Sequence, residues 1–112
     1  MDEQIQPKLQ FEKIIDGELH QKYLITLADV YCRRILDSIL DESKSAIEIS
    51  IDTQVPLRTV YRRIQDMVDN KIVKISGNIT DSGKKYFMYK SKIRGLHTRY
   101  SEKQLEVFVL KN

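Results

Sequence analysis

The spacing of apolar residues predicts three helices in the first two thirds of the chain. Apolar residues recur at the interval of a 3.6-residue turn over 23–41 and over 56–70, which predicts two amphipathic helices. Over 45–52, isoleucines alternate with polar residues as in a strand, but Ser45 followed by Glu48 forms a capping box. The capping box favours a short helix, and we predict a helix for this segment.

Polar residues refine the two longer helices. Asp29, Arg33 and Asp37 follow one another at intervals of four residues, so we expect them to form ion pairs on the outer face of the first helix. Pro56 suits the first turn of a helix, where its missing N–H is not needed. Asn70 is expected to end the last helix in a left-handed conformation.

The hydrophobic period changes to two after residue 70, which predicts two β-hairpins. The first hairpin has strands at 72–79 and 85–90 around a turn of Thr, Asp, Ser, Gly and Lys. The second has strands at 96–100 and 105–110. The sequence therefore predicts an α+β protein in which helices come first and hairpins follow.

Charge is distributed unevenly along the chain. The 112 residues include 19 Lys and Arg and 16 Asp and Glu, for a net charge of +3. Residues 1–50 carry a net charge of −4, and residues 51–112 carry +7. Between residues 58 and 99 there are 11 basic residues and three acidic ones. Such a block is typical of a protein that binds a polyanion, although a solvated basic face without a partner has the same composition.

The order of the predicted elements is short helix, tight connection, arginine-rich helix and basic hairpin, which is the order of a winged helix-turn-helix. The recognition helix of that motif enters the DNA major groove by its N-terminal residues. We expect the helix over 56–70 to do this, because a guanidinium matches guanine or phosphate in bidentate fashion. Lysines after the hairpin turn are expected along the flanking backbone. The predicted DNA-binding residues are Arg58, Thr59, Tyr61, Arg62, Arg63, Lys84 and Lys85.

Three runs of residues carry a resemblance to a known family. They run from Leu27 to Leu36, from Glu48 to Ile64 and from Asp69 to Val73. The first resembles the first conserved helix of ArsR-like winged-helix regulators, and the other two resemble the helix-turn-helix of that family and the start of its wing. The similarity covers about residues 23–89, and the C-terminal hairpin is similar to extensions on small archaeal members.

This resemblance implies a dimeric, DNA-binding transcription regulator whose groove-facing positions are Arg58, Thr59, Tyr61 and Arg62. The chain departs from the family pattern in its turn, where Gln54 replaces the usual glycine, and in the preceding helix, where Ser50 replaces the usual alanine. The paired cysteines or histidines of metal-sensing members are absent, so metal sensing is not implied.

Composition excludes several classes of protein. The single cysteine, Cys32, cannot form an intramolecular disulfide or a multi-cysteine metal site, and a buried, inert thiol is the favoured interpretation of it. His20 and His97 are too far apart for a metal motif. No apolar run approaches the ~20 residues of a membrane span, and residues 1–10 lack the apolar region of a secretory signal. We expect a soluble cytoplasmic protein without a cofactor or metal.

Two other functions are consistent with parts of the sequence. A winged helix also serves as a protein–protein interaction module in larger assemblies, since fold does not determine function. Aromatic residues over 86–89 are typical of base stacking in RNA binders, but strands favour aromatics, so a packed hairpin explains them better. We do not expect an enzyme, because the sequence has no glycine-rich phosphate loop, nucleophile elbow or metal pair.

The predicted organisation has three parts. Residues 1–20 form an N-terminal extension, 21–91 the winged helix-turn-helix domain, and 92–112 an additional C-terminal β-hairpin. We expect a homodimer bound to double-stranded DNA, because one module offers few base contacts and because apolar residues in the N-terminal segment and last strand are available to pack on the domain or a second subunit. In the N-terminal segment these residues are Phe11, Ile14 and Ile15.

Overall fold

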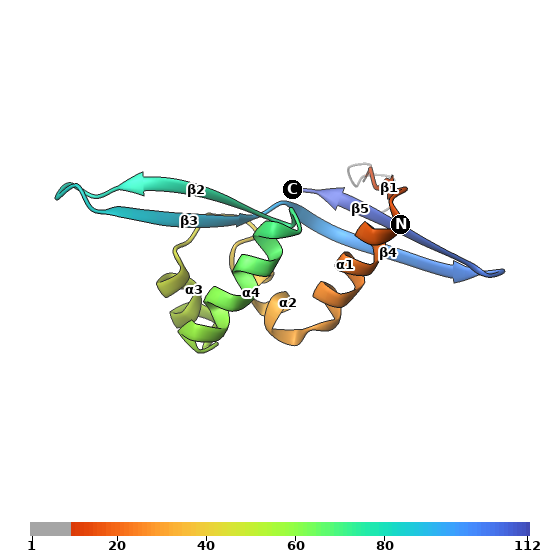
Figure 1. The fold of residues 1–112 in the computed structure, drawn as a ribbon, viewed down its shortest axis with the longest axis horizontal. Coiled ribbons are helices and arrows are strands. Elements are labelled where there is room, and N and C mark those ends of the chain that lie inside the picture. Colours follow the sequence, from red (N-terminus) through yellow and green to blue (C-terminus); the bar gives the residue numbers. More distant parts are fainter. Residues whose placement is uncertain (1–9) are drawn as a thin grey trace, which may run out of the picture.

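The computed structural model describes residues 10–112, which form an α+β fold of four helices and five strands (Figure 1). The helices are α1 (Gly17–Ala28), α2 (Val30–Ser38), α3 (Ala46–Thr53) and α4 (Leu57–Asp69). The strands are β1 (Glu12–Ile14), β2 (Val73–Ile79), β3 (Lys85–Ser91), β4 (Ile93–Ser101) and β5 (Gln104–Lys111).

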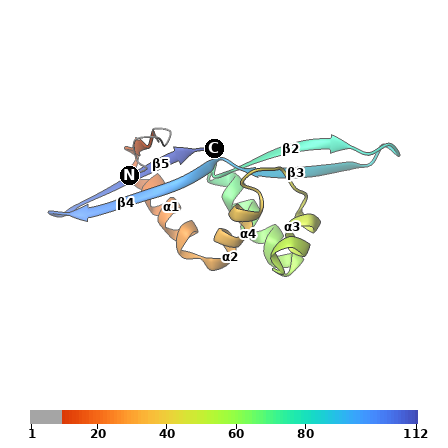
Figure 2. The ribbon, with the colours of Figure 1, turned by 180° about the vertical axis from the view of Figure 1, so that it is seen from behind.

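All strand pairings are antiparallel, and they form two separate sheets. Strands β2 and β3 form a two-stranded hairpin, and strands β1, β5 and β4 form a three-stranded sheet in that order. The two hairpins extend in opposite directions from the centre of the molecule, and the helices lie on one side of them (Figures 1 and 2). The molecule therefore measures 56 × 34 × 24 Å.

The core lies where the helices meet the bases of the two hairpins. Each of the four helices and each of the two sheets contributes at least one buried apolar side chain. A single backbone bridge between Lys44 and Tyr89 ties the segment before α3 to the base of the first hairpin. The largest fully buried side chains are Ile35, Ile39, Ile49, Ile64, Met67, Ile72, Val55, Val60 and Val107.

The prediction of one helix over 23–41 is wrong, because the segment forms two helices that meet at Asp29. The backbone of Asp29 is extended (φ −85°, ψ 121°), and its carboxylate accepts a hydrogen bond of 2.8 Å from the Tyr31 amide, which begins α2. The first helix also begins earlier, at Gly17. The predicted ion pairs with Asp29 and Asp37 do not form, since Arg33 donates to the Leu27 carbonyl instead.

The helices predicted over 45–52 and 56–70 and the two hairpins are confirmed, with ends that shift by a few residues. The prediction that Asn70 ends α4 in a left-handed conformation is wrong. Asn70 has φ −86°, and the next residue, Lys71, has φ 63°. Two consecutive positive φ values, 49° at Glu102 and 67° at Lys103, form the two-residue turn of the second hairpin.

The sequence pattern did not predict β1. This strand pairs with β5, so part of the N-terminal extension and the C-terminal hairpin form one sheet. Ile14 packs against the core from β1, whereas Ile15 stays 81% exposed. Phe11 lies against His97, with ring centroids 6.3 Å apart, and His97 in turn lies 5.7 Å from Phe108.

Cys32 is buried in α2, as the sequence predicts, with 5% of its surface exposed. Burial, assisted by the nearby carboxylate of Asp29, raises the pKa of its thiol to about 11. Over residues 10–112, no helix combines the length and the apolar character needed to cross a lipid bilayer.

Candidate nucleic-acid interface

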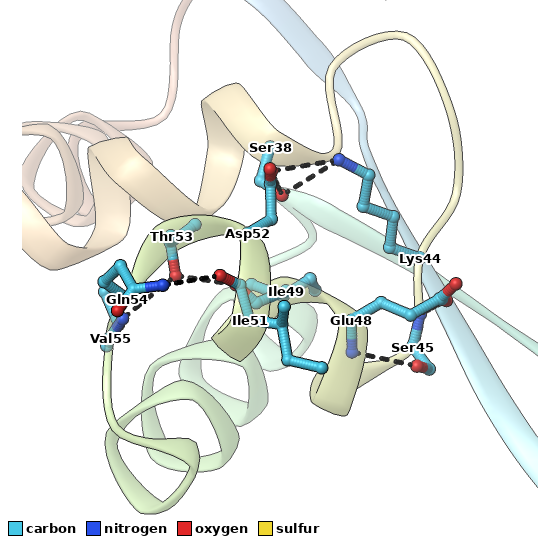
Figure 3. Close-up of polar contacts among 10 residues, drawn as sticks. All are labelled: Ser38, Lys44, Ser45, Glu48, Ile49, Ile51, Asp52, Thr53, Gln54 and Val55. Carbon is cyan, nitrogen blue, oxygen red and sulfur yellow. Dashed lines mark hydrogen bonds and ion pairs between the residues drawn. The ribbon is translucent and has the colours of Figure 1, made fainter.

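The N-terminus of α3 is fixed by the predicted capping box. The Ser45 hydroxyl accepts a hydrogen bond of 3.2 Å from the Glu48 amide, and the Glu48 carboxylate accepts one of 2.8 Å from the Ser45 amide (Figure 3). Two amides that a helix start leaves without partners are thereby satisfied. This local exchange explains why the alternating isoleucines of the segment form a helix instead of a strand.

The side chain of Asp52 anchors α3 to the end of α2. It accepts hydrogen bonds of 2.6 Å from the Ser38 hydroxyl and 3.0 Å from the Lys44 ammonium (Figure 3). The Ser38 hydrogen bond, followed by the Lys44 contacts, lowers the pKa of Asp52 below its ordinary value. The carboxylate thus joins two segments that precede α4 in the chain.

The connection between α3 and α4 depends on Gln54, which has the left-handed conformation (φ 63°, ψ 19°). Glycine is the usual residue at such positions, because a Cβ atom strains this conformation. Here the Gln54 backbone amide donates a hydrogen bond of 2.9 Å to the Ser50 carbonyl. The Gln54 side-chain amide donates one of 3.0 Å to the Ile51 carbonyl (Figure 3). These bonds offset the strain and hold the turn without a glycine.

Ser50 and Thr53 add further hydrogen bonds to this turn. The Ser50 hydroxyl donates 2.7 Å to the Val55 carbonyl. The Thr53 hydroxyl donates 2.7 Å to the Ile49 carbonyl and accepts 3.2 Å from the Val55 amide (Figure 3). Both departures from the family pattern, Gln54 and Ser50, therefore take part in fixing the angle between α3 and α4.

Arg58 and Arg62 lie exposed on α4, one helical turn apart. The core-facing side of this helix consists of Val60, Ile64 and Met67. Within residues 10–112, neither arginine forms an ion pair with a carboxylate. The two guanidinium groups are therefore available to a partner that approaches α4 from outside.

The charge order of α4 is the reverse of the order that stabilises a helix. The helix dipole favours acidic side chains in the first turn and basic ones in the last, each by about 0.3–1 kcal/mol. The first turn of α4 contains Arg58 and no acidic residue, and its last turn contains no basic residue. The stability of α4 therefore does not explain the positions of these charges.

Arg63 is placed differently from the other two arginines. Its guanidinium forms an ion pair of 2.7 Å with Asp29, between α1 and α2, and lies 5.8 Å from the ring centroid of Tyr31. Only about a quarter of each of the two charged side chains is exposed. Arg63 therefore joins α4 to the first two helices, and the structure does not place it with Arg58 and Arg62.

Two further predicted residues, Thr59 and Tyr61, lie beside the arginines on α4. Thr59 is half-buried, and Tyr61 is 51% exposed. Tyr89, at the base of the first hairpin, has a pKa that is raised mainly by burial, and Tyr61 is close enough to add to this shift.

The predicted lysines Lys84 and Lys85 lie at the far end of the first hairpin, and both are exposed. The Lys84 amide donates 2.9 Å to the Thr80 hydroxyl, and Gly83 has a φ of 85°, which closes the turn before them. The Lys85 ammonium lies 5.7 Å from the ring centroid of Phe87. The hairpin length separates these lysines from the arginines of α4 (Figure 1).

The register of the first hairpin brings together two lysines that are not among the predicted DNA-binding residues. Lys74 pairs directly with Lys90, so both side chains lie on one face, and the pair of Ile75 and Tyr89 lies on the other. The sequence predicts the hairpin, but its register was needed to bring the two lysines together. In the part of the chain that the structure describes, no cluster of His, Cys, Asp or Glu has the makings of a metal site.

Comparisons with known proteins find no relative of this chain. A scan against protein-family models finds no match, and searches of curated proteins and of solved structures find none either.

Proposed function

We propose that the chain is a DNA-binding transcription regulator with a winged helix-turn-helix fold, similar to the ArsR-like family. In this proposal α3 and α4 are the two helices of the motif, and the hairpin of β2 and β3 is the wing. The observation that carries the proposal is the pair of exposed arginines, Arg58 and Arg62, which lack a carboxylate partner among the described residues and oppose the dipole of their own helix.

The N-terminal half of α4 would enter the major groove, whose width of about 12 Å accepts one helix. Arg58 and Arg62 would contact bases or phosphates, with Thr59 and Tyr61 beside them. Lys84 and Lys85, at the end of the wing, would contact the flanking backbone and contribute affinity with little sequence readout. Arg63 has a supporting role, because its pair with Asp29 holds α4 in position.

A homodimer belongs to this proposal, because one module offers few base contacts. Several large apolar side chains outside the core support a second subunit. Ile15 is 81% exposed, Ile25 is 62% exposed and Tyr100 is 74% exposed. In a symmetric dimer, two α4 helices would meet two half-sites about one helical turn of DNA apart.

The test of DNA binding is to select bound sequences from a random duplex pool and to measure affinity against salt concentration. A dimer with about four to five phosphate contacts per subunit should show log K falling with log salt at a slope of about −7 to −9. A palindromic consensus would support the dimer. Absence of an enriched sequence together with a flat salt dependence would contradict the proposal.

Arg62→Ala sharpens this test at one residue. The substitution should weaken binding to the selected site by about 1–3 kcal/mol and relax specificity, if Arg62 reads a base. Arg99→Ala, in the second hairpin, removes another exposed arginine and serves as the control, with the selected affinity expected to change little. Equal losses for the two variants would show that Arg62 contributes only general positive charge.

A protein–protein interaction module is the second candidate, and exposed isoleucines support it. Ile47 and Ile51 on α3 are 56% and 69% exposed, and Ile79 on the first hairpin is 71% exposed. This alternative predicts that retention on heparin and on random duplex DNA is absent or insensitive to ionic strength, which is the opposite of the DNA-binding proposal.

A further inference from the structure

A lysine-lined cleft lies between the end of α4, the base of the first hairpin and the end of β5. Figure 1 shows that these segments meet near the centre of the molecule. Its volume is about 540 Å³, which is in the range of small-molecule sites. Segments that are far apart in the sequence contribute its positive charges. The cleft lysines are Lys71, Lys74, Lys90, Lys92 and Lys111.

The cleft has a large excess of positive charge. Among the lining residues that the structure describes, Glu12 is the one with a side-chain carboxylate, and it pairs with Lys111 at 3.1 Å. The other four cleft lysines form no ion pair with any residue in the described range 10–112. Like charges gathered in this way repel one another, so the fold alone gives no reason for them. A bound polyanion would remove the repulsion.

The floor of the cleft is largely apolar, and the cleft lining also includes the polar residues Ser91 and Asn112. Ile14, Ile93 and Val109 line it together with Tyr23, whose side chain is only 7% exposed. The Tyr23 hydroxyl makes no hydrogen bond to another residue between 10 and 112, and it is near enough to Lys111 to sense its charge. Apolar walls with a few convergent polar groups are the usual composition of a ligand site.

The cleft is separate from the proposed DNA-binding surface. Lys74 and Lys90 lie on one face of the first hairpin, whereas Tyr89 lies on the opposite face. The cleft lining includes no residue of α4 and neither Lys84 nor Lys85. The cleft and the predicted DNA contacts therefore consist of different residues.

We propose that the lysine-lined cleft binds a small ligand with a polyphosphate chain, of the nucleoside triphosphate class. The cleft lysines hold the phosphates, the Tyr23 hydroxyl donates a hydrogen bond to a phosphate oxygen, and the apolar floor receives the less polar part of the ligand. This binding site does not depend on the DNA-binding proposal, since none of its residues is among the predicted DNA contacts.

Calorimetric titration of the full chain with ATP, AMP and inorganic triphosphate at low salt tests the proposal. ATP and triphosphate should bind at micromolar to low millimolar concentration, and AMP should bind at least about tenfold more weakly because it has fewer charges to share among the lysines. ATP should bind more tightly than triphosphate because of the apolar floor. Equal affinity for AMP and ATP, or no binding of ATP at millimolar concentration, would overturn the proposal.

Two matched double variants locate the binding. Lys74→Gln with Lys90→Gln removes two cleft lysines, and affinity for ATP should fall by about tenfold or more. Lys84→Gln with Lys85→Gln removes the same charge from the end of the hairpin and should change it less than about twofold. All four residues are on the surface, and thermal unfolding checks that each variant is folded. Equal losses would mean general attraction to a basic protein and would refute the site.

Tyr23→Phe removes only the hydroxyl and should weaken ATP binding by about tenfold, since a hydrogen bond to a charged group is lost. Unchanged affinity would contradict the role given to Tyr23.

Random duplex DNA provides the last part of the test. If the Lys74 and Lys90 double variant loses as much affinity for duplex DNA as for ATP, the cleft is part of a nucleic-acid surface and the proposal of a small-ligand site fails.

Discussion

The two β-hairpins of this protein have similar lengths but opposite surroundings for their charged residues. In the hairpin of β4 and β5, Glu106 pairs with Lys13 at 3.1 Å and with Arg99 at 3.5 Å. In the hairpin of β2 and β3, the lysines form no ion pair with any residue of the described chain. These lysines are Lys74, Lys84, Lys85 and Lys90.

The two hairpins also differ in burial. Strand β5 buries Val107 and Val109 against the helices and has a neighbouring strand on both sides. The first hairpin is buried only near its base, at Val73 and Tyr89, and its outer part consists of two strands alone. A two-stranded hairpin without a covered face contributes little stability. We infer that the second hairpin supports the fold and that the first presents charge to a partner.

The same contrast exists within α4 between two consecutive arginines. Arg63 is paired with Asp29, and Arg62 has no such partner in the described chain. A charge whose partner lies inside the chain contributes to stability, and a charge without one is available for binding. These differences in burial and in charge pairing lead to four predictions.

Truncating one apolar side chain in each hairpin should give very different losses of stability. Val107→Ala removes methyl groups from a fully buried site and should lower the free energy of unfolding by about 2 kcal/mol. Ile79→Ala removes more atoms but from a side chain that is 71% exposed, so the loss should be within about 0.5 kcal/mol. Urea unfolding measures both. Similar losses would mean that the first hairpin has a structural role that its exposure does not reveal.

Replacing the two consecutive arginines by methionine should separate their roles. Methionine keeps much of the apolar stem, so the main change is the charge. Arg63→Met leaves the half-buried Asp29 without its partner and should lower the free energy of unfolding by about 1–2 kcal/mol, between the values for exposed and buried pairs. Arg62→Met should change it by less than about 0.5 kcal/mol. Thermal or urea unfolding measures the stability of the two variants. Equal losses of stability would contradict the difference between the roles of Arg62 and Arg63.

Removing lysines from the end of the first hairpin should change the salt dependence of DNA binding. For Lys84→Gln with Lys85→Gln, the slope of log K against log salt should become shallower by about 0.9 for each phosphate contact that is lost. Lys13→Gln with Arg99→Gln removes the same charge from the sheet of the second hairpin and should leave the slope unchanged. Fluorescence anisotropy over a salt series measures both slopes, and a change in the second variant alone would reverse our assignment of the hairpins.

Acid should weaken the contact that positions Arg63. Burial alone would raise the pKa of Asp29, but the hydrogen bond from the Tyr31 amide and the charge of Arg63 outweigh it, so the pKa lies below its ordinary value. The resulting stabilisation is present above the ordinary carboxyl pKa and is lost as the pH falls through the lower folded-state value. As the pH falls from about 5 to about 2, the Asp29→Asn variant should therefore lose less stability than the unaltered chain.

The pH series needs a matched carboxylate as its control. Asp37→Asn changes an exposed residue of α2 that forms no ion pair within residues 10–112, and its stability should follow the unaltered chain throughout the acid range. Melting temperatures recorded at successive pH values give the comparison. If Asp29→Asn also follows the unaltered chain, the pair with Arg63 does not contribute to stability.

The sequence predicts the elements of this fold well where neighbouring residues determine them. Ser45 and Glu48 are three residues apart, so their mutual hydrogen bonds, and with them α3, follow from the sequence. The break at Asp29 was missed because the apolar stripe continues through it, since α1 and α2 pack on the same core. The cap that Asp29 provides for α2 was the available signal.

Long-range pairings were not accessible to sequence reasoning. The partner of Arg63 is 34 residues away in the chain, and the packing of α4 on α2 brings Asp29 to it. Strand β1 has three residues and depends on β5, which comes almost one hundred residues later. The cleft lysines are spread along the sequence from Lys71 to Lys111. No local pattern therefore predicts that they meet.

The buried thiol of Cys32 can be used to measure local opening of the protein. An alkylating reagent reacts with the thiolate, and at neutral pH a thiol with a pKa of about 11 is almost entirely protonated as well as covered. Because the chain has one cysteine, alkylation reports the exposure of Cys32 alone. The rate of that single modification, followed by mass spectrometry, would report how readily the structure around Cys32 opens, without any substitution in the chain.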